Sequence, residues 1–271
     1  MTEPSYLQWG SPRQRGRGRR GSDRAESFGT VADDYDRFRP SYPDAMIDDL
    51  VALAPAAALD VACGTGKATT LLAARGLNVL GVEVDPRMAS VARRQGLAVE
   101  VGAFESWDAA GRRFDLIACA QAWHWIDAAT GIGKAADLLN SGGTLVPFWN
   151  YGELDERTQQ AMDEVYERTA PRLSRSGGGG ARGFDQLEEE HLPHLRGSGR
   201  FVSIETRCHP WERDYSAVEW TDMVQTHSDH LQLEPEHRAR LVDALHEMIE
   251  GQGGVLQVRY STFGIFARVA G

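Results

Sequence analysis

Cysteine is scarce in this sequence. Cys63, Cys119 and Cys208 are widely spaced, and none of them belongs to a CxxC pair. An odd number of isolated cysteines argues against a disulfide scaffold. We therefore expect the chain to function in a reducing compartment, the cytoplasm.

Long apolar runs are also missing, since no stretch approaches the ~18 consecutive apolar residues that a membrane-spanning helix needs. With 42% hydrophobic and 25% charged residues, the composition is typical of a globular protein and excludes global disorder. We expect a soluble protein without a membrane partner. A length of 271 residues suits one large domain or a core domain with an inserted subdomain.

Positive charge is concentrated at one end of the chain. Residues 1–27 carry six arginines and three acids, a net charge of +3. Because the net charge of the whole chain is −10, residues 28–271 carry −13. A body this acidic disfavours nucleic acid as a partner, because the phosphate backbone attracts clustered cations. The N-terminal segment has no apolar core and does not read as a secretory signal. We interpret residues 1–27 as a disordered basic tail, with a weak nucleic-acid-binding arm as the alternative.

Strand-like and helix-like segments alternate regularly from residue 41 to about residue 150. After a helix predicted at 41–54, stopped by Pro55, helices are predicted for example at 67–75 and 86–95, each closed by a glycine. Strands alternating with helices of about ten residues indicate βαβ units and a parallel sheet covered on both faces, a doubly wound α/β fold. The predicted strands are Ala57–Val61, Asn78–Val82, Ala98–Val101, Phe114–Cys119 and Gly143–Phe148.

The pattern changes after residue 150, where we predict a cap insertion at 151–199 and a C-terminal part at 200–271 that completes both sheet and cap. Helices are predicted at 153–170, 216–233 and 235–250, and strands at 201–207 and 255–269, the last interrupted at Gly264. Residues 174–183 contain four consecutive glycines and are predicted to form a flexible loop.

The most informative segment is Leu59–Gly66, which ends the first predicted strand, turns through glycines and begins a helix. Ligands of such sheets bind at the carboxyl ends of the strands, and the glycines allow a ligand close to the backbone. A dinucleotide fingerprint needs a third glycine at position 69, which is Thr69, so pyrophosphate is disfavoured. Asp60 instead suits a cationic group, and Glu83, ending the second strand, suits the two hydroxyls of a ribose. S-adenosylmethionine has a ribose, an ammonium group and no phosphate.

At this point the chain resembles the class I S-adenosylmethionine-dependent methyltransferases, from about residue 28 to its C-terminus. The resemblance implies a mostly parallel, seven-stranded, Rossmann-like sheet with a small helical cap, and a core domain at 28–150. Segment 35–43, the Trp123-His124-Trp125 motif and a Thr-Phe pair in the last strand are similar to the type 11, trans-aconitate methyltransferase-like branch. The matching motifs are Leu59–Gly66, Gly81–Met88, Val101–Glu105, Phe114–Asp127 and Leu138–Phe148.

The resemblance also implies the residues of the cofactor site. Ala103 stands where relatives often have an aspartate that reads adenine, so backbone N–H groups and Phe104 are expected to hold the base instead. Asp85 we interpret as a helix cap. The expected cofactor-binding residues are Asp60, Ala62, Cys63, Gly64, Thr65, Gly66, Glu83, Val84, Met88, Ala103, Phe104, Glu105, Ala120 and Gln121.

Three residues are candidates for the reaction itself. His124 follows the fourth strand and is either a general base or substrate partner, or a histidine that hydrogen-bonds locally. Tyr35 and Arg39 lie where the family places a lid, and Arg39 suits an acidic substrate because a guanidinium pairs well with a carboxylate. Of Trp123 and Trp125, one is expected in the core, because alternate residues of an extended segment point oppositely.

No metal is expected. His191, His194, Cys208 and His209 match no zinc-finger spacing, and we discount them as a site. We therefore predict a metal-independent methyltransferase acting on a small molecule. The alternatives are an S-adenosylmethionine-dependent enzyme with non-methylating chemistry, a nucleic-acid methyltransferase that uses the arginine-rich arm, and a binding protein without catalysis. The sequence names neither the acceptor nor the oligomeric state.

Overall fold

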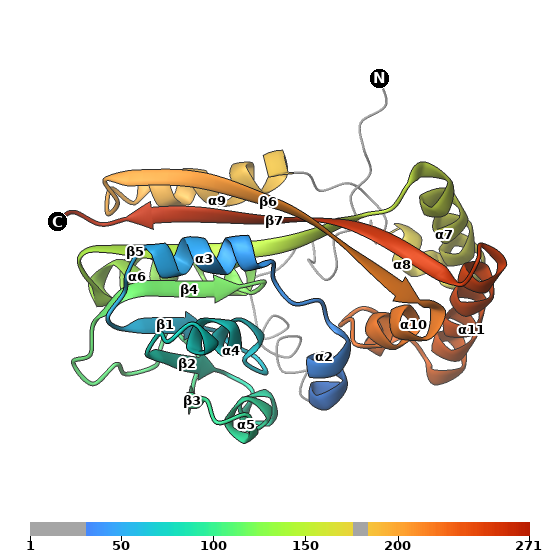
Figure 1. Cartoon of the computed structure of the whole chain (residues 1–271), viewed down its shortest axis with the longest axis horizontal. Helices are drawn as coiled ribbons and strands as arrows, with labels where there is room; N and C mark the ends of the chain where they lie inside the picture. Colours follow the sequence, from blue (N-terminus) through green and yellow to red (C-terminus); the bar gives the residue numbers. More distant parts are fainter. Residues whose placement is uncertain (1–30, 176–183) are drawn as a thin grey trace.

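A seven-stranded sheet dominates the computed structural model, which describes residues 31–175 and 184–271 (Figure 1). The strand order is β3-β2-β1-β4-β5-β7-β6. The first five strands along this order pair in parallel, whereas β7 is antiparallel to both of its neighbours. The predicted doubly wound, mostly parallel sheet is confirmed. The strands are β1 (Ala58–Val61), β2 (Val79–Glu83), β3 (Ala98–Val101), β4 (Phe114–Ala120), β5 (Leu139–Glu153), β6 (Ser203–Ser216) and β7 (Val255–Arg268).

Helices cover both faces of the sheet, as the alternation of strands and helices predicted. The helices up to β5 are α2 (Ala32–Phe38), α3 (Asp44–Ala52), α4 (Lys67–Ala74), α5 (Pro86–Arg94), the 3₁₀ turn η2 (Trp123–Trp125) and α6 (Ala128–Leu138). Those after β5 are α7 (Glu156–Thr169), α8 (Pro171–Arg175), α9 (Phe184–Gly197), α10 (Ala217–Gln225), the 3₁₀ turn η3 (His230–Gln232) and α11 (Pro235–Gly251). In the described parts of the chain, no helix combines the length and the apolar character needed to cross a bilayer.

The pleat of the central strands explains how two separate cores form. On β4, Leu116 and Ala118 pack with α3 and α4, while Ile117 and Cys119 belong to the core of the opposite face, together with residues of α6 and α9. A third core joins α7, α10 and α11 to the far ends of β6 and β7, and includes the fully buried Trp220. The long strands β5, β6 and β7 therefore extend beyond the parallel sheet and carry a helical layer at one end (Figure 1).

Several details differ from the sequence prediction. The helix predicted at 216–233 is instead α10 followed by the 3₁₀ turn η3, and the strand predicted at 201–207 continues as β6 to Ser216. Strand β7 runs through Gly264 without interruption. A Cβ at Gly264 would lie 2.9 Å from Cε of Met46, so the glycine serves the close approach of α3. Helix α9 was not predicted, although Leu192 and Leu195 bury their side chains in the core. The predicted loop at 174–183 begins two residues too early, because α8 includes 174 and 175, and the remaining residues of that loop, like the tail 1–27, lie outside the described residues. β5 runs from Leu139 to Glu153, so it begins before and ends after the strand predicted at 143–148.

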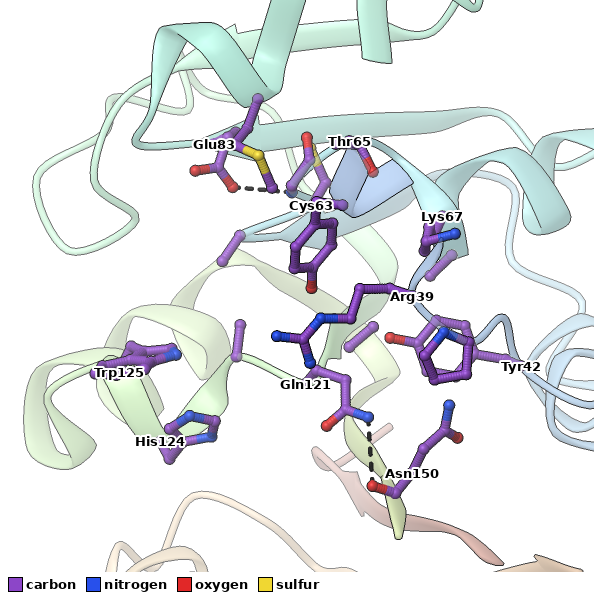
Figure 2. Close-up of a pocket in the computed structure, with 18 of the residues that line it drawn as sticks. Arg39, Tyr42, Cys63, Thr65, Lys67, Glu83, Gln121, His124, Trp125 and Asn150 are labelled. Atoms are coloured by element: carbon purple, nitrogen blue, oxygen red, sulfur yellow. Dashed lines mark hydrogen bonds between the residues drawn. The ribbon is translucent and has the colours of Figure 1, made fainter. Parts of the chain in front are cut away.

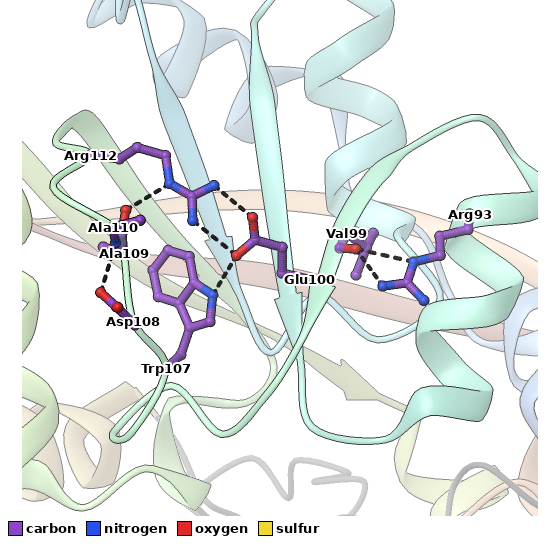
Figure 3. A network of polar contacts seen from close by, with 8 residues as sticks. All are labelled: Arg93, Val99, Glu100, Trp107, Asp108, Ala109, Ala110 and Arg112. Atoms are coloured by element: carbon purple, nitrogen blue, oxygen red, sulfur yellow. Dashed lines mark hydrogen bonds and ion pairs between the residues drawn. The ribbon is translucent and has the colours of Figure 1, made fainter.

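A polar network fixes the loop after β3 (Figure 3). The Glu100 carboxylate accepts hydrogen bonds from Trp107 Nε1 at 2.7 Å and from both terminal nitrogens of Arg112 at 2.7 and 2.9 Å. Arg112 Nε also donates to the carbonyl of Ala109 at 2.7 Å. Both ends of the loop are therefore tied to the edge strand of the sheet.

Candidate functional site

A cleft opens at the carboxyl ends of β1, β2 and β4, where the strand order reverses between β1 and β4. It encloses about 1130 Å³ of space, part of which is open solvent. Ligands of open α/β sheets bind at this topological switch point. In Figure 2, Arg39 lies at the centre of the cleft, with Glu83 and Thr65 on one side and Gln121 and Asn150 on the other.

The glycine turn after β1 forms one wall of the cleft. Ala62, Gly64 and Gly66 all have positive φ values, of 52°, 59° and 90°, so the backbone coils tightly before α4 begins. Thr65 lines the cleft, its side chain is 1% exposed, and its hydroxyl has no hydrogen-bond partner. A buried hydroxyl without a partner carries a desolvation penalty that a polar ligand group relieves. This wall therefore offers a polar group that the protein itself leaves without a hydrogen bond.

Glu83 lies beside this turn and lines the cleft. Its Oε2 accepts a hydrogen bond from the backbone N–H of Gly64 at 2.8 Å, and its Oε1 accepts one from the N–H of Asp85 at 2.9 Å. Burial nevertheless raises the pKa of this carboxyl above its usual value. A carboxylate oxygen offers two lone pairs, so each oxygen keeps one acceptor site for a ligand hydroxyl. This geometry fits the bidentate ribose contact expected from the sequence.

Asp60 does not line the cleft, which departs from its expected contact with a cationic group. Successive side chains of a strand point to opposite faces, and Asp60 points under the sheet toward α4, where its Oδ2 accepts a hydrogen bond from the Thr69 hydroxyl at 2.6 Å. Its Oδ1 is buried without a partner. Burial raises the pKa of Asp60 to about 7. Asp60 thus connects β1 to the first turn of α4.

The raised pKa of Asp60 predicts a pH-dependent stability. Because the folded pKa of about 7 exceeds the ordinary value of 3.8, the folded state binds the proton more tightly, and the free energy of unfolding falls as pH rises from about 4 to about 7. The neutral Asp60→Asn variant lacks this loss and is expected to exceed the wild type at pH 8 by roughly 4 kcal/mol, with little difference at pH 4. Urea unfolding across this range measures the effect. The exposed Asp243→Asn is the matched control, and parallel curves for Asp60→Asn and the wild type would contradict the prediction.

The segment expected to read adenine also departs from expectation, since Ala103, Phe104 and Glu105 do not line the cleft. The carbonyl of Ala103 accepts the N–H of Trp107 at 2.8 Å, which closes a helical turn. Phe104 is buried in the core with its ring centroid 6.4 Å from that of Trp123, and Glu105 accepts the N–H of Asp127 at 3.1 Å. Gly66 is likewise absent from the lining and caps α4.

Tyr35, on α2, and Arg39, the residue that follows α2, both line the cleft. Arg39 Nε donates to the hydroxyl of Thr226 at 2.8 Å, and Nη2 donates to the carbonyl of the same residue at 3.1 Å. The guanidinium also lies 5.2 Å from the centroid of the Tyr35 ring. Burial lowers the pKa of Arg39, because removal from water disfavours the charged form. The cleft therefore contains a desolvated cation held at the end of α10.

His124 and Trp125 lie on the opposite wall. His124 Nδ1 accepts a hydrogen bond from Trp149 Nε1 at 3.4 Å. This contact engages Nδ1, so Nε2 is the ring nitrogen left to act toward another group, as donor or acceptor according to the tautomer. Trp123 is in the core, as expected for one of the two tryptophans, although the segment is a 3₁₀ turn rather than extended.

The remaining expected residues have simple placements. Ala62, Cys63, Val84, Met88, Ala120 and Gln121 all line the cleft. Asp85 caps α5, accepting the N–H of Arg87 at 2.8 Å, as interpreted from the sequence. Cys119 is buried, as expected.

Several cleft residues had not been identified from the sequence. Lys67 directly follows the glycine turn, which was a usable signal, and its Nζ donates to the carbonyl of Asp36 at 2.5 Å. Asn150 bridges two segments, donating to the carbonyl of Ser41 at 2.8 Å and accepting from the Thr262 hydroxyl at 2.7 Å. Tyr42, Met223 and Tyr260 also line the cleft. Tyr42 belongs to the motif at 35–43, although no role was predicted for it, whereas no motif marked Met223 and Tyr260.

Comparison with known proteins supports the family resemblance. Residues 58–143 match the family model described as a methyltransferase domain. An uncharacterized methyltransferase of Mycobacterium tuberculosis is 41% identical over 131 residues, which are 47% of this chain and 54% of that protein. The chain therefore spans about half the length of the curated relatives it matches.

Two solved structures share the fold. A protein from Anaeromyxobacter dehalogenans described as a type II methyltransferase aligns with a TM-score of 0.64 at 20% identity, covering 86% of this chain and 99% of that one. Phosphoethanolamine N-methyltransferase 2 of Haemonchus contortus, solved with phosphomonomethylethanolamine and S-adenosylhomocysteine, aligns with a TM-score of 0.51 at 16% identity, covering 95% of this chain and 61% of that one. At these identities the likeness shows the fold alone.

The strand order, the cleft at the switch point and the match over residues 58–143 together define a class I S-adenosylmethionine-dependent methyltransferase domain. S-adenosylmethionine is the cofactor of this class, and the Glu83 geometry and the buried Thr65 hydroxyl fit its ribose and its polar tail. The finer assignment to the type 11 branch stays a prediction.

Proposed function

We propose that this protein transfers the methyl group of S-adenosylmethionine to a small-molecule acceptor bearing an anionic group. The observation that carries the proposal is the juxtaposition in one cleft of Glu83, an acceptor for ribose hydroxyls, and the half-buried guanidinium of Arg39. The Glu83 carboxylate favours a cofactor with hydroxyl groups. The Arg39 guanidinium, in the same cleft, favours an acceptor with an acidic group.

The cofactor half of the cleft is formed by residues that follow β1 and β2. Glu83 would accept the ribose hydroxyls, and Thr65 with the backbone of the glycine turn would bind the amino-acid end. Met88 and Val84 supply apolar contacts beside them. Ala103 and Phe104 do not line the cleft, so adenine would instead be held by packing against Met88 and Val84.

The acceptor half is formed by Arg39, Gln121, Trp125, Asn150 and Tyr260. Tyr260 is held rigidly, since its hydroxyl lies 2.7 Å from that of Tyr215 and its ring stacks on Trp211 with centroids 4.4 Å apart. We propose that residues 151–199 are a cap insertion over this half, and that residues 200–271 complete both the sheet, through β6 and β7, and the cap, through their helices. The aromatic walls exclude water from the acceptor.

When bound, S-adenosylmethionine supplies an activated methyl group on a sulfonium, so the protein contributes alignment and desolvation. Arg39 orients the acceptor, and Gln121 and Asn150 present amide groups around it. An anionic acceptor needs no general base, so the scheme assigns His124 no proton transfer. No step in this scheme uses a metal ion. The scarcity of cysteine supports a reducing compartment such as the cytoplasm.

The test is a coupled assay of S-adenosylhomocysteine formation with a panel of carboxylic acids, phenols and amines. Methyl transfer to acids is the expected result. Binding of S-adenosylmethionine without S-adenosylhomocysteine release for any acceptor would favour non-methylating chemistry, and turnover with nucleic acid alone would overturn the acceptor class.

Replacement of Arg39 separates acceptor binding from cofactor binding. For the best acid, Arg39→Ala is expected to lower kcat/KM by about 100-fold, because a buried charge partner is lost, with the Kd for S-adenosylhomocysteine changed only a few-fold. Thr226→Val is the matched control, since it removes the hydroxyl that holds Arg39 but leaves the guanidinium in place. We expect it to lower kcat/KM by about tenfold. Unchanged acceptor kinetics in Arg39→Ala would remove Arg39 from the acceptor site.

A further inference from the structure

A group of metal-binding side chains lies outside the cleft, in the segment between α10 and η3. Ring nitrogens of His227 and His230 and a carboxylate oxygen of Asp229 lie within 4.8 Å of one another. Both histidines are buried, and Asp229 is half-buried. None of the three lines the cleft, so they are not needed for the methyl-transfer scheme.

We propose that His227, Asp229 and His230 form a binding site for a divalent transition-metal ion, Zn²⁺ being the representative case. Two imidazoles and one carboxylate are ligands that Zn²⁺ accepts, and a water molecule would fill the fourth position of the tetrahedron. Because the group lies outside the cleft, we expect the bound ion to stabilise the helical layer. The proposal is independent of the proposed methyl transfer.

The distances fit such a site after small side-chain rotations. Two atoms bound to one Zn²⁺ at about 2.1 Å lie about 3.0–3.4 Å apart. Asp229 Oδ1 is already 2.8 Å from His230 Nδ1, and the rings of His227 and His230 are 5.3 Å apart at 71°. Because all three ligands come from four consecutive residues, the backbone holds them together.

An outer hydrogen bond completes the arrangement. The Tyr166 hydroxyl on α7 lies 2.8 Å from Nε2 of His230. With the metal on Nδ1, the proton of His230 stays on Nε2, which then donates to the Tyr166 oxygen. Metal-bound histidines generally carry such a partner on the other nitrogen, because it fixes the ring orientation. The metal would thus connect the α10–η3 segment to α7.

Arg39 makes the site electrostatically distinctive. Its guanidinium is bonded to Thr226, the residue before His227. A bound dication and this guanidinium repel each other, so we expect removal of the Arg39 charge to tighten metal binding. A surface site elsewhere on the chain would not respond to Arg39.

The other histidines do not form a comparable group. His191 stacks on Trp149, and His209 bonds to Asp49 at 2.8 Å. Among residues 31–175 and 184–271, the His227–Asp229–His230 group is the one such cluster. The zinc assembly of His191, His194, Cys208 and His209, discounted from the sequence, is not gathered in the structure.

The test is calorimetric titration of the full chain, stripped with a chelator, with ZnCl₂ alone. We expect 1:1 binding that raises Tm, weakened at least tenfold in Asp229→Asn and His230→Gln, and about tenfold in Tyr166→Phe. Arg39→Ala is expected to bind several-fold more tightly. Co²⁺ substitution should give a visible absorption band in the wild type that Asp229→Asn lacks.

His237→Gln is the matched control, because His237 is exposed on α11 and belongs to no cluster. Circular dichroism of each variant checks folding, and Tyr166→Phe keeps the test valid if a ligand variant does not fold. Absence of 1:1 binding in the wild type, or equal affinity in Asp229→Asn, Tyr166→Phe and His237→Gln, would overturn the proposal.

Discussion

Replacement of Glu83 by alanine is expected to raise the Kd for S-adenosylhomocysteine at least about 100-fold, which is about 3 kcal/mol. The variant would lack the two charge-assisted bonds between the carboxylate and the ribose hydroxyls. It would also lose the bond from the N–H of Gly64 that holds the glycine turn against β2. Calorimetric titration of both proteins with S-adenosylhomocysteine measures the difference.

Glu83→Gln sharpens this experiment. Both carboxylate oxygens accept backbone N–H groups, so a glutamine amide must turn its NH₂ toward one of them. We expect a loss of about tenfold, between wild type and alanine. Glu236→Ala, exposed on α11, is the control. A folded Glu83→Ala protein with wild-type affinity would place the cofactor site elsewhere.

Gly81→Ala is expected to lower the stability by about 2 kcal/mol. Gly81 lies in the middle of β2, and a Cβ there would be 2.6 Å from Sγ of Cys63 and 3.1 Å from Cγ2 of Val99. Because Cys63 belongs to the glycine turn, the clash would also displace the cofactor wall. Thermal unfolding should show Tm lower by roughly 4–8 °C, with weaker S-adenosylhomocysteine binding.

A double variant tests the cause. Cys63→Ala removes the sulfur that the new methyl group meets, so Gly81→Ala/Cys63→Ala is expected to recover most of the lost Tm. Gly96→Ala, at a glycine of φ 85° with open space around it, measures backbone strain without a clash. If Cys63→Ala gives no recovery, the contact between Gly81 and Cys63 is not the source of the loss.

The local features of the cofactor wall were predictable from the sequence. Glu83 at the end of β2 and the turn Ala62–Gly66 depend on strand ends and glycine conformations, which are set by neighbouring residues. The same holds for the Asp85 cap. The ribose and the absence of a phosphate followed from these positions, whereas the ammonium group was inferred from Asp60, which does not line the cleft.

The direction of individual side chains was less predictable. Asp60 is one residue from the end of β1, and the pleat turns it toward α4 instead of the cleft. Phe104 begins a helical turn that places its ring in the core. Both departures concern the direction in which a side chain leaves the backbone. That direction depends on the pleat of the strand or on the local turn, which sequence motifs do not specify.

By itself, the sequence determined the fold class, the strand ends and the residue types of the cofactor wall, because these depend on local periodicity and turn chemistry. Only the tertiary structure decided the acceptor half. Arg39 meets Thr226 across 187 positions of the chain, and Asn150 meets Ser41 across 109. Such contacts depend on how β5, β7 and the helical layer pack against α2. Long-range packing, unlike turn chemistry, leaves no periodic mark on the residues that it brings together.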